Sequence, residues 1–381
     1  MKEIGKIKDA CTVIAGQSPK GTSYNENGEG MEFHQGKKAF GESIIESSNV
    51  WTTEITKIAE PGDILMSVRA PVGPTNITDR KICIGRGLAA IRCNKDIIPH
   101  YILYALRNIE SKIIGNDGAV FNSINKKQIE DLPLPLLSLA EQQSVVDYLD
   151  SSFAKIDAMK ANAEKALNEA KALFQASLKE MLEPKEGWEE KKLGDIATDM
   201  YRGSGVKRDQ VTEKGMSCVR YGEIYTKYNY HFKECESHTL PQYVNSPKYF
   251  ENGDILFAIT GESVEEIGKC IAYTGGEKCI AGGDIVVMKH NNEPRYISYA
   301  LSTPSAIKQK GQGKTKLKVV HTNIPSLKEI IIPIAPQDEQ IKIANTLDAL
   351  KSKVDRLQAN FDKISQECDA LKQAILKQVF E

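Results

Sequence analysis

Four side chains that could bind a metal ion lie in one stretch of the chain, namely Cys218, His231, Cys235 and His238. Thiolate and imidazole groups are the usual ligands of structural zinc, but such sites normally include a closely spaced Cys-x-x-Cys pair. No Cys-x-x-Cys pair occurs among the eight cysteines, and several stand in apolar patterns such as Cys83-Ile84. We therefore expect reduced core thiols, with no metal site and no disulfide framework.

A second candidate for chemistry is Gly313-Lys314-Thr315, which resembles the end of a phosphate-binding loop. That loop requires another glycine five residues before its last one, and this position holds Lys308. The chain also lacks the Asn-Pro-Pro-Tyr or Asp-Pro-Pro-Tyr signature of methyltransferases, and no arrangement of His, Asp and Ser or of paired carboxylates stands out. We expect a non-catalytic protein without a cofactor.

The overall charge of the chain is close to zero, with 50 Lys and Arg residues against 51 Asp and Glu residues. The cations are unevenly distributed, because residues 139–182 and 336–381 together carry −3, which leaves a net charge of +2 on the rest. The clearest basic run extends from Lys308 to Lys318 and contains five lysines without an acid. Such runs are often only solvated surface, but they also suit contacts with phosphate groups.

The elements that must position these side chains are organised around a repeat. Residues 138–182 align without a gap with residues 336–380, so that Glu141-Gln142 matches Glu339-Gln340. In both copies apolar residues recur at steps of three and four, which predicts two long helices with a coiled-coil seam. The seam of the second copy comprises Ile343, Leu347, Leu350, Val354, Leu357, Phe361, Ile364, Cys368, Leu371 and Ile375. We expect the two helices to pair with each other in an antiparallel coiled coil; the alternative is that each forms a separate dimer.

The ends of these helices divide the chain into four segments. Ser138 stands three residues before Glu141, as in a capping box, and Glu183-Pro184 ends the first helix. The segments that we expect are a first module at 1–138, a helix at 139–182, a second module at 183–335 and a helix at 336–381.

The two modules also resemble each other, although less strongly than the helices do. Pro61-Gly62-Asp63-Ile64-Leu65 matches Asn252-Gly253-Asp254-Ile255-Leu256. Short strand-like runs bounded by Gly, Pro and Asn give way to one short helix near 99–112 and to its counterpart near 294–309. Each module is expected to be a mixed α+β domain, with the same scaffold but different loops. This division is typical of two recognition modules that differ in specificity.

In this combination and order, these features resemble the specificity subunit of type I restriction–modification systems. The shared motifs are the repeated half, the Gly-Asp-Ile-Leu strand, the Leu-Pro-Leu-Pro or Ile-Pro-Ile-Ala-Pro lead into a helix that starts with Glu-Gln, and the Leu-Asp pair on that helix. The resemblance covers essentially the whole chain. It implies two target recognition domains separated by an antiparallel helix pair that sets the spacer, each domain reading one half of a bipartite DNA site. It also implies assembly with two methyltransferase subunits and two ATP-dependent motor-nuclease subunits, and no catalysis by this subunit.

Reading the major groove needs forked or amide side chains, with Arg suited to guanine and Asn or Gln to adenine, while Lys and backbone amides contact phosphates. The candidate DNA-binding residues of the first module are Gln35, Lys37, Lys38, Arg69, Asn122, Ser123 and Lys126. Those of the second module are Arg220, Tyr221, Glu223, Tyr225, Lys314, Lys316 and Lys318. Structural alternatives exist, since Arg69 could serve in an ion pair, the tyrosines in the core and any lysine in a solvated surface.

Two other functions stay open from the sequence. One is a coiled-coil scaffold or adaptor that does not bind DNA, and the other is the recognition subunit of a system that only methylates. No apolar run reaches membrane-spanning length and the N-terminus has no signal peptide, so we expect a soluble, cytoplasmic protein.

Overall fold

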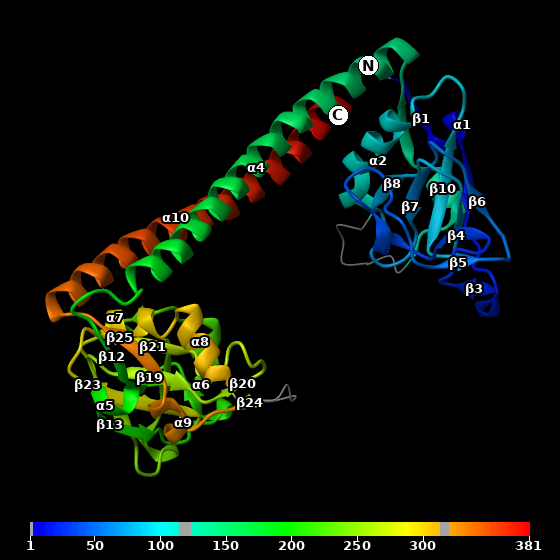
Figure 1. The fold of residues 1–381 in the computed structure, drawn as a ribbon. Helices are drawn as coiled ribbons and strands as arrows, with labels where there is room; N and C mark the ends of the chain where they lie inside the picture. The colour runs from blue at the N-terminus through cyan, green and yellow to red at the C-terminus, as the bar shows by residue number, and fades with distance from the viewer. Residues whose placement is uncertain (1–2, 114–122, 313–319) are drawn as a thin grey trace. The chain divides into compact units, whose positions relative to one another are not determined.

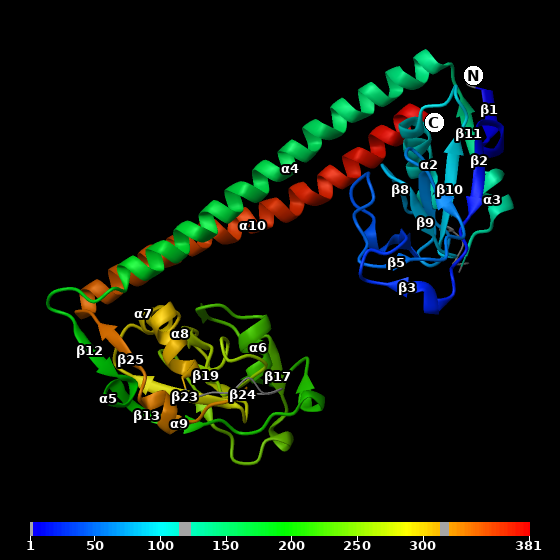
Figure 2. The same cartoon turned by 45° about the vertical axis from the view of Figure 1, so that its right-hand side comes forward.

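The computed structural model describes residues 3–113, 123–312 and 320–381. The chain forms two compact units, one made of residues 1–164 and 361–381 and the other of residues 165–360 (Figure 1 and Figure 2). Each unit therefore combines one globular module with parts of both long helices. Among the described residues, no helix has the length and apolar character needed to span a lipid bilayer.

The module of the first unit is built from short strands and helices. Its strands are β1 (Glu3–Lys6), β2 (Cys11–Ala15), β3 (Tyr24–Asn25), β4 (Met31–His34), β5 (Trp51–Thr52), β6 (Ile58–Ala59), β7 (Ile64–Ser67), β8 (Thr75–Ile77), β9 (Ile82–Ile84), β10 (Leu88–Cys93) and β11 (Pro133–Leu136). Its helices are α1 (Ile7–Ala10), α2 (Pro99–Ile113) and α3 (Lys126–Glu130), with 3₁₀ turns η1 (Gly21–Ser23) and η2 (Lys37–Ala39).

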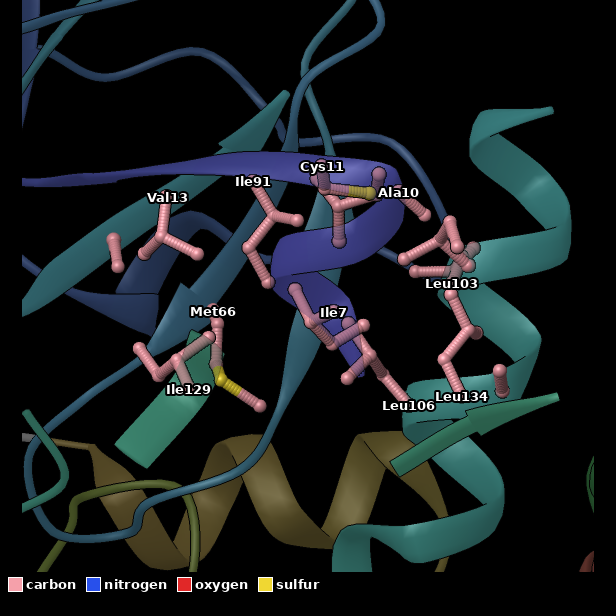
Figure 3. Packing of buried hydrophobic residues seen from close by; sticks show 14 of the residues in the cluster. Ile7, Ala10, Cys11, Val13, Met66, Ile91, Leu103, Leu106, Ile129 and Leu134 are labelled. Carbon is pink, nitrogen blue, oxygen red and sulfur yellow. The ribbon is translucent and has the colours of Figure 1, made fainter. Parts of the chain in front are cut away.

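Two sheets form the scaffold of this module. One is antiparallel with the order β2-β10-β7-β8, and the other has the order β3-β5-β4-β9-β6, in which β4 and β9 run parallel. Figure 3 shows the larger core, where side chains of α1, β2, β7 and β10 meet those of α2, α3 and β11. Ile64, Ile91, Ile102 and Leu106 are fully buried there. Burial of each such side chain stabilises the fold by about 1.5–3 kcal/mol, so this core holds α2 against the antiparallel sheet.

The module of the second unit repeats this plan. Its strands are β12 (Glu189–Lys192), β13 (Ala197–Arg202), β14 (Val211–Thr212), β15 (Met216–Val219), β16 (His231–Phe232), β17 (Ser237–Thr239), β18 (Tyr249–Phe250), β19 (Ile255–Ala258), β20 (Thr260–Gly261), β21 (Cys270–Tyr273), β22 (Cys279–Ala281), β23 (Ile285–His290), β24 (Val320–His321) and β25 (Ile331–Ile334). Its helices are α5 (Leu193–Ile196), α6 (Tyr221–Thr226), α7 (Pro294–Ala300), α8 (Pro304–Gly311) and α9 (Ile324–Lys328), with η3 (Arg208–Gln210) and η4 (Pro241–Tyr243).

The sheet topologies of the two modules correspond, although the second module has β16 and the ribbon β20-β24 in addition. The orders β13-β23-β19-β21-β16 and β14-β17-β15-β22-β18 extend and repeat those of the first module, and β15 again runs parallel to β22. The short ribbon β1-β11 has its counterpart in β12-β25. The prediction of two similar mixed α/β modules is therefore confirmed.

The helix expected near 294–309 is divided into α7 and α8, which corrects the prediction of a single helix. The Thr303 hydroxyl accepts a hydrogen bond from the backbone N–H of Ala306 at 3.4 Å and caps α8, and Pro304 follows at the first helical position. Because proline has no N–H and a fixed φ, it starts a helix readily but cannot continue one. The helix predicted near 99–112 is present as α2 without a break.

The long helices are α4 (Leu139–Met181) and α10 (Gln337–Phe380). As predicted, Ser138 and Glu141 form a capping box at the start of α4, since the Ser138 hydroxyl accepts from the N–H of Glu141 at 3.4 Å and the Ser138 N–H donates to the Glu141 carboxylate at 2.9 Å. In the first unit, Lys372 Nζ lies 2.5 Å from Asp157, and Lys160 Nζ lies 3.7 Å from Asp369. Residue numbers on α10 fall as those on α4 rise, so the two helices run antiparallel. The predicted antiparallel coiled coil is confirmed.

The seam deviates from the heptad prediction near the end of α10. Cys368 is buried as predicted, but Leu371 is 48% exposed. The next position, Lys372, lies over the Phe153 ring with Nζ 5.5 Å from its centroid, and the apolar seam resumes at the buried Leu376. The aliphatic part of a lysine side chain can cover an apolar surface while its ammonium group reaches a carboxylate. The periodicity of apolar residues in a sequence does not reveal such a lysine.

Each module is joined to its own long helix by a glutamine of the repeated Glu-Gln pair. Gln142 is buried, and its Nε2 donates to the carbonyl of Leu137 at 2.9 Å while its Oε1 accepts from the N–H of Ile98 at 2.9 Å. Gln340 makes the corresponding bonds in the second unit, at 2.7 and 3.0 Å. The amide thus ties the start of the helix to the loop before α2 or α7.

The aspartate of the repeated Leu-Asp pair forms a second attachment. The Tyr104 hydroxyl donates to Asp150 at 2.5 Å, and the Tyr299 hydroxyl donates to Asp348 at 2.6 Å. Both repeated motifs of the long helices therefore face their own module, which explains why they occur at the same position in both copies.

Candidate nucleic-acid interface

The two modules have a cleft at the same structural position, beyond the ends of the parallel strands β4 and β9 or β15 and β22. In the first module the N–H of Gly85 donates to the carbonyl of His34 at 2.9 Å, and in the second the N–H of Gly282 donates to the carbonyl of Val219 at 2.8 Å. The registers of the two parallel pairs agree as well. The first residue after β4 therefore corresponds to the first residue after β15.

Beside each cleft, two backbone segments approach each other so closely that only glycine fits at one position. A Cβ atom at Gly16 would lie 2.2 Å from the carbonyl oxygen of Gly85, and a Cβ atom at Gly203 would lie 2.2 Å from that of Gly282. Carbon and oxygen atoms without a bond between them cannot approach to this distance. These glycines keep the exit of β2 or β13 against the turn before β10 or β23, and so fix one wall of the cleft.

The cleft of the first module has a volume of about 920 Å³ and is lined by Gln35, Lys38, Ser18 and Arg86, among others. The Ser18 hydroxyl donates to Gln35 Oε1 at 2.9 Å and accepts from the N–H of Arg86 at 3.2 Å. Gln35 and Lys38 are exposed, and no hydrogen bond from Gln35 Nε2 to another described residue is present. One amide donor is therefore oriented and available at this cleft.

Close to Gln35 in the chain, the buried carboxylate of Glu32 forms an ion pair with the half-buried Arg80. Arg80 donates from Nε and Nη2 to the Glu32 carboxylate at 2.7 and 2.9 Å, and His34 Nε2 lies 2.8 Å from the same group. Burial by itself would raise the pKa of Glu32, but hydrogen bonds from Arg80, the Ser48 backbone and His34 outweigh it and lower the value to about 2. Burial is the main cause that lowers the pKa of His34. Glu32 is thus an ionised structural anchor.

The cleft of the second module has a volume of about 740 Å³. Basic and acidic side chains line it together, and these are Lys207, Arg208, Arg220, Lys227, Glu223 and Asp284. Lys227 forms an ion pair with Glu236 and Asp284 forms one with Arg202, whereas Lys207 and Arg208 are exposed at the cleft. The positive charges of Lys207 and Arg208 are suited to contacts with phosphate groups.

Arg220 lies at the mouth of this cleft, 28% exposed at its side chain. Its Nε is buried and finds no hydrogen-bond partner among the described residues, and it lies 3.9 Å from the carboxylate of Glu223. Glu223 is only 2% exposed, and it accepts hydrogen bonds from the N–H of Arg220 at 2.8 Å and from the Ser237 hydroxyl. Glu223 therefore holds the backbone of Arg220 and lies near its guanidinium, and its burial suits it to positioning Arg220 better than to contacting a base.

The two candidate tyrosines differ in their surroundings. Tyr221 is 40% exposed and lies between the large cleft and a smaller one of about 330 Å³. Tyr225 is half-buried, and its hydroxyl donates to the carbonyl of Glu266 at 3.3 Å. Burial raises the pKa of Tyr225, followed by the charge of Glu266, so the hydroxyl stays protonated. Of these two candidates, Tyr221 is the one available for stacking at the clefts of the second module.

The other described candidates of the first module lie outside its cleft. Arg69 and Ser123 are exposed and form an isolated antiparallel bridge, and Lys126 lies in α3 with Nζ 3.5 Å from Glu130. Lys37 is exposed at the start of η2. The remaining candidates lie outside the described residues, and these are Asn122, Lys314, Lys316 and Lys318.

The candidates chosen from the sequence do not include several residues that the fold brings to these sites. The Ser18 hydroxyl joins Gln35 to the backbone of Arg86, and Lys207 and Arg208 reach the second cleft from the segment after β13. The sequence contained one indication of these sites, namely the nearby glycines Gly16 and Gly203. At both positions two backbone segments approach each other closely.

The suspected metal ligands do not come together. Among the described residues, no group of three or more His, Cys, Asp and Glu side chains could hold a metal ion. The eight cysteines are free thiols, six of them buried and the others, Cys93 and Cys235, half-buried.

Two modules of one topology, each with its own cleft and its own long helix, define a protein with a duplicated recognition-domain architecture. The model of the family described as "Type I restriction modification DNA specificity domain" matches residues 2–169 and again residues 185–365. The chain belongs to this family and contains its domain twice. The resemblance to type I specificity subunits stated from the sequence is confirmed.

Individual relatives are also named as type I specificity subunits. A protein of Methanocaldococcus jannaschii, provisionally named the type I restriction enzyme MjaX specificity subunit, is 45% identical over 140 residues, which are 36% of this chain and 32% of the relative. The EcoKI specificity subunit of Escherichia coli (strain K12) is 24% identical over 287 residues, 69% of this chain and 60% of the relative. The StySPI specificity subunit of Salmonella potsdam is 23% identical over 78% of this chain and 68% of the relative. The chain thus spans about a third of the first relative and about two thirds of the others.

Solved structures share the fold. A chain from a study of complex assembly and conformational transition of the type I R-M system has a TM-score of 0.76 at 16% identity, with 100% of this chain and 97% of that chain covered. The HsdS subunit from Thermoanaerobacter tengcongensis has a TM-score of 0.57 at 16% identity, with 99% and 96% covered.

Proposed function

We propose that this chain is the DNA-reading subunit of a type I restriction–modification complex, and that each module binds one half of a bipartite site on double-stranded DNA. The observation that carries the proposal is the recurrence of one cleft at the same position of both modules, with different side chains along it. A common scaffold gives both modules the same docking geometry. Different side chains in the clefts give them different target sequences.

The side chains at the clefts have the chemistry that DNA contact requires. Lys38 and Arg86 in one cleft, and Lys207 and Arg208 in the other, can contact phosphates and fix the position of the module on the duplex. Gln35, Arg220 and Tyr221 can reach base edges or stack. Exposed Arg69, Ser123 and Lys126 extend the proposed contact surface of the first module, and Glu223 supports it by holding Arg220.

We further propose that α4 and α10 set the spacer between the half-sites and provide the surface to which two methyltransferase subunits dock. Two motor-nuclease subunits complete the restriction complex. Insertion of one matched heptad into each helix, near Ala163 and Phe361, adds about 10 Å, or about 3 base pairs of DNA. Selection from a randomised DNA pool should then recover both half-sites with a longer spacer. An unchanged spacer contradicts the spacer role of the helices.

Salt dependence of binding tests the cleft assignment. The slope of log affinity against log salt falls by about 0.9 for each phosphate contact that is lost. The double variant Lys207→Gln with Arg208→Gln should therefore lower the slope by about 2 for every DNA sequence. Lys363→Gln is the matched control, because Lys363 is 72% exposed on α10 and forms an ion pair with Glu367 of the same helix.

The same measurement separates DNA binding from the scaffold alternative. A wild-type chain that selects no sequence and shows no salt-dependent affinity for duplex DNA would make it an adaptor. Equal slopes for the wild type and the cleft variant would remove Lys207 and Arg208 from the contact surface. Methylation of host DNA without restriction activity would identify a system that only methylates.

A further inference from the structure

We infer that the first residue after β4 and β15 selects a purine in each half-site, with Gln35 reading adenine and Arg220 reading guanine. This inference rests on the proposed function, because it assumes that both modules bind duplex DNA. It adds the base identity read at one position of each half-site.

The two residues occupy one equivalent position of the scaffold. Each follows a strand that runs parallel to β9 or β22, and each stands beside a turn whose glycine N–H binds the last carbonyl of that strand. A Cβ atom at Gly85 would lie 2.5 Å from Gln35 Oε1, and one at Gly282 would lie 3.2 Å from the Cα of Arg220. The turns therefore enclose both residues closely, and the backbone delivers both side chains to the cleft in the same way.

Gln35 is held through its side chain and Arg220 through its backbone, and both side chains retain unused donors. The Ser18 hydroxyl holds Gln35 Oε1 at 2.9 Å, which leaves the second lone pair of Oε1 and the Nε2 donor for a base. The buried carboxylate of Glu223 holds the N–H of Arg220 at 2.8 Å and lies beside its guanidinium. No hydrogen bond from that guanidinium to another described residue is present. A preorganised group loses less conformational freedom on binding, which raises its selectivity.

The chemistry of the two groups decides which base each prefers. An amide can accept from N6 of adenine and donate to N7, whereas a guanidinium can donate to both O6 and N7 of guanine. Neither group can satisfy both edge atoms of the other purine. The wrong base at such a position lowers affinity about 5- to 150-fold.

Exchange of the two residue types tests the assignment in the full-length chain. Arg220→Gln should change one base pair of the second half-site from G·C to A·T in a selection from randomised duplexes, and should leave the first half-site unchanged. Gln35→Arg should cause the reverse change in the first half-site only. The unchanged half-site in each variant shows that the chain is folded and bound.

Two further variants separate base reading from general binding. Arg220→Lys retains the charge but lacks the fork, so guanine preference should fall about 5-fold or more while the salt slope stays within about 0.3 of wild type. Arg208→Gln, at the same cleft, should lower the affinity for all DNA sequences alike without changing the base preference.

The outcomes distinguish the inference from the proposed function. If the wild type selects a bipartite site and Arg220→Gln and Gln35→Arg select the same bases as wild type, the purine assignment is wrong while DNA reading stands. If the wild type selects no site, both fail. A change of base confined to the expected half-site supports the assignment.

Discussion

Replacement of Asp348 by Asn tests how firmly the second module is held to its long helix. Asp348 accepts hydrogen bonds from the Tyr299 hydroxyl and from Arg295 Nη1, each at 2.6 Å, and lies 2.9 Å from His231 Nε2. Its side chain is only 24% exposed. Asparagine has nearly the same size but presents an N–H₂ group to these donors. We expect the free energy of unfolding of the second unit to fall by about 2–3 kcal/mol.

The pH dependence of this loss follows from the pKa of Asp348. Burial alone would raise this pKa, but hydrogen bonds from His231, Tyr299 and Arg295 outweigh it and lower the value to about 2. A carboxyl whose pKa falls on folding stabilises the folded state above its unfolded pKa of about 4, and this contribution is lost as the pH falls toward 2. The difference between wild type and Asp348→Asn should stay constant from about pH 7 to 5 and shrink below about pH 4.

Urea unfolding followed by the fluorescence of Trp188 measures this effect, in a background where Trp51 is replaced by Phe. Trp188 reports on the same junction, because its Nε1 donates to Glu339 of α10 at 2.9 Å. Asp150→Asn, followed through Trp51 in a Trp188→Phe background, is the matched control. Its carboxylate is more exposed and accepts from Tyr104, so we expect a loss of about 1 kcal/mol or less. Equal losses in both units, or a loss in the Asp348 variant that is the same at pH 3 and pH 7, would refute the reasoning.

Three further predictions concern stability and use the same assay. Gly203→Ala should lower the free energy of unfolding by more than about 2 kcal/mol, because the new Cβ would lie 2.2 Å from a backbone carbonyl oxygen. A Cβ at Gly205 would face open space, so Gly205→Ala should change this free energy by less than about 1 kcal/mol. Gln340→Ala should lower the free energy of unfolding by about 2–3 kcal/mol, because it leaves buried backbone groups unpaired. Gln143→Ala, at an exposed position, should lower it by less than about 0.5 kcal/mol. Similar values for both variants would contradict the anchoring role of Gln340. Lys310→Met should raise the free energy of unfolding of the second unit by about 1–3 kcal/mol at pH 7, because burial lowers the pKa of Lys310 and disfavours its charged form. This gain in stability should shrink toward pH 10, where the lysine is increasingly neutral in the unfolded chain as well. A gain that does not change with pH would contradict the argument.

Repeated features of the sequence predicted the architecture well. The heptads of α4 and α10, the capping box of Ser138 and the two matching modules depend on local patterns, or on a comparison of the chain with itself. Leu371 was predicted wrongly as a seam residue, because the choice between Leu371 and Lys372 depends on what the partner helix presents at that level. The break before Pro304 could have been predicted from the Thr-Pro pair alone.

The candidate site was only partly accessible from the sequence. Gln35 and Arg220 stood out because they lie where the two modules differ, and both line a cleft or its mouth. The burial of Glu223 could not be read from its side-chain type, since an acidic residue after a strand is equally consistent with an exposed loop. Lys207 and Arg208 reach the cleft through strand pairing over long separations, which no local pattern encodes.

The division of the chain into units has a consequence for its synthesis. The second unit is continuous from 165 to 360, whereas the first needs residues 361–381 to be complete. Those residues supply Cys368 and Leu376 to the apolar cluster around Leu149 and Phe153. Domains fold as they leave the ribosome, with the N-terminal part generally first. Here the first module to emerge is attached to a helix whose apolar residues Leu149 and Phe153 lack these contacts until residues 361–381 have been synthesised.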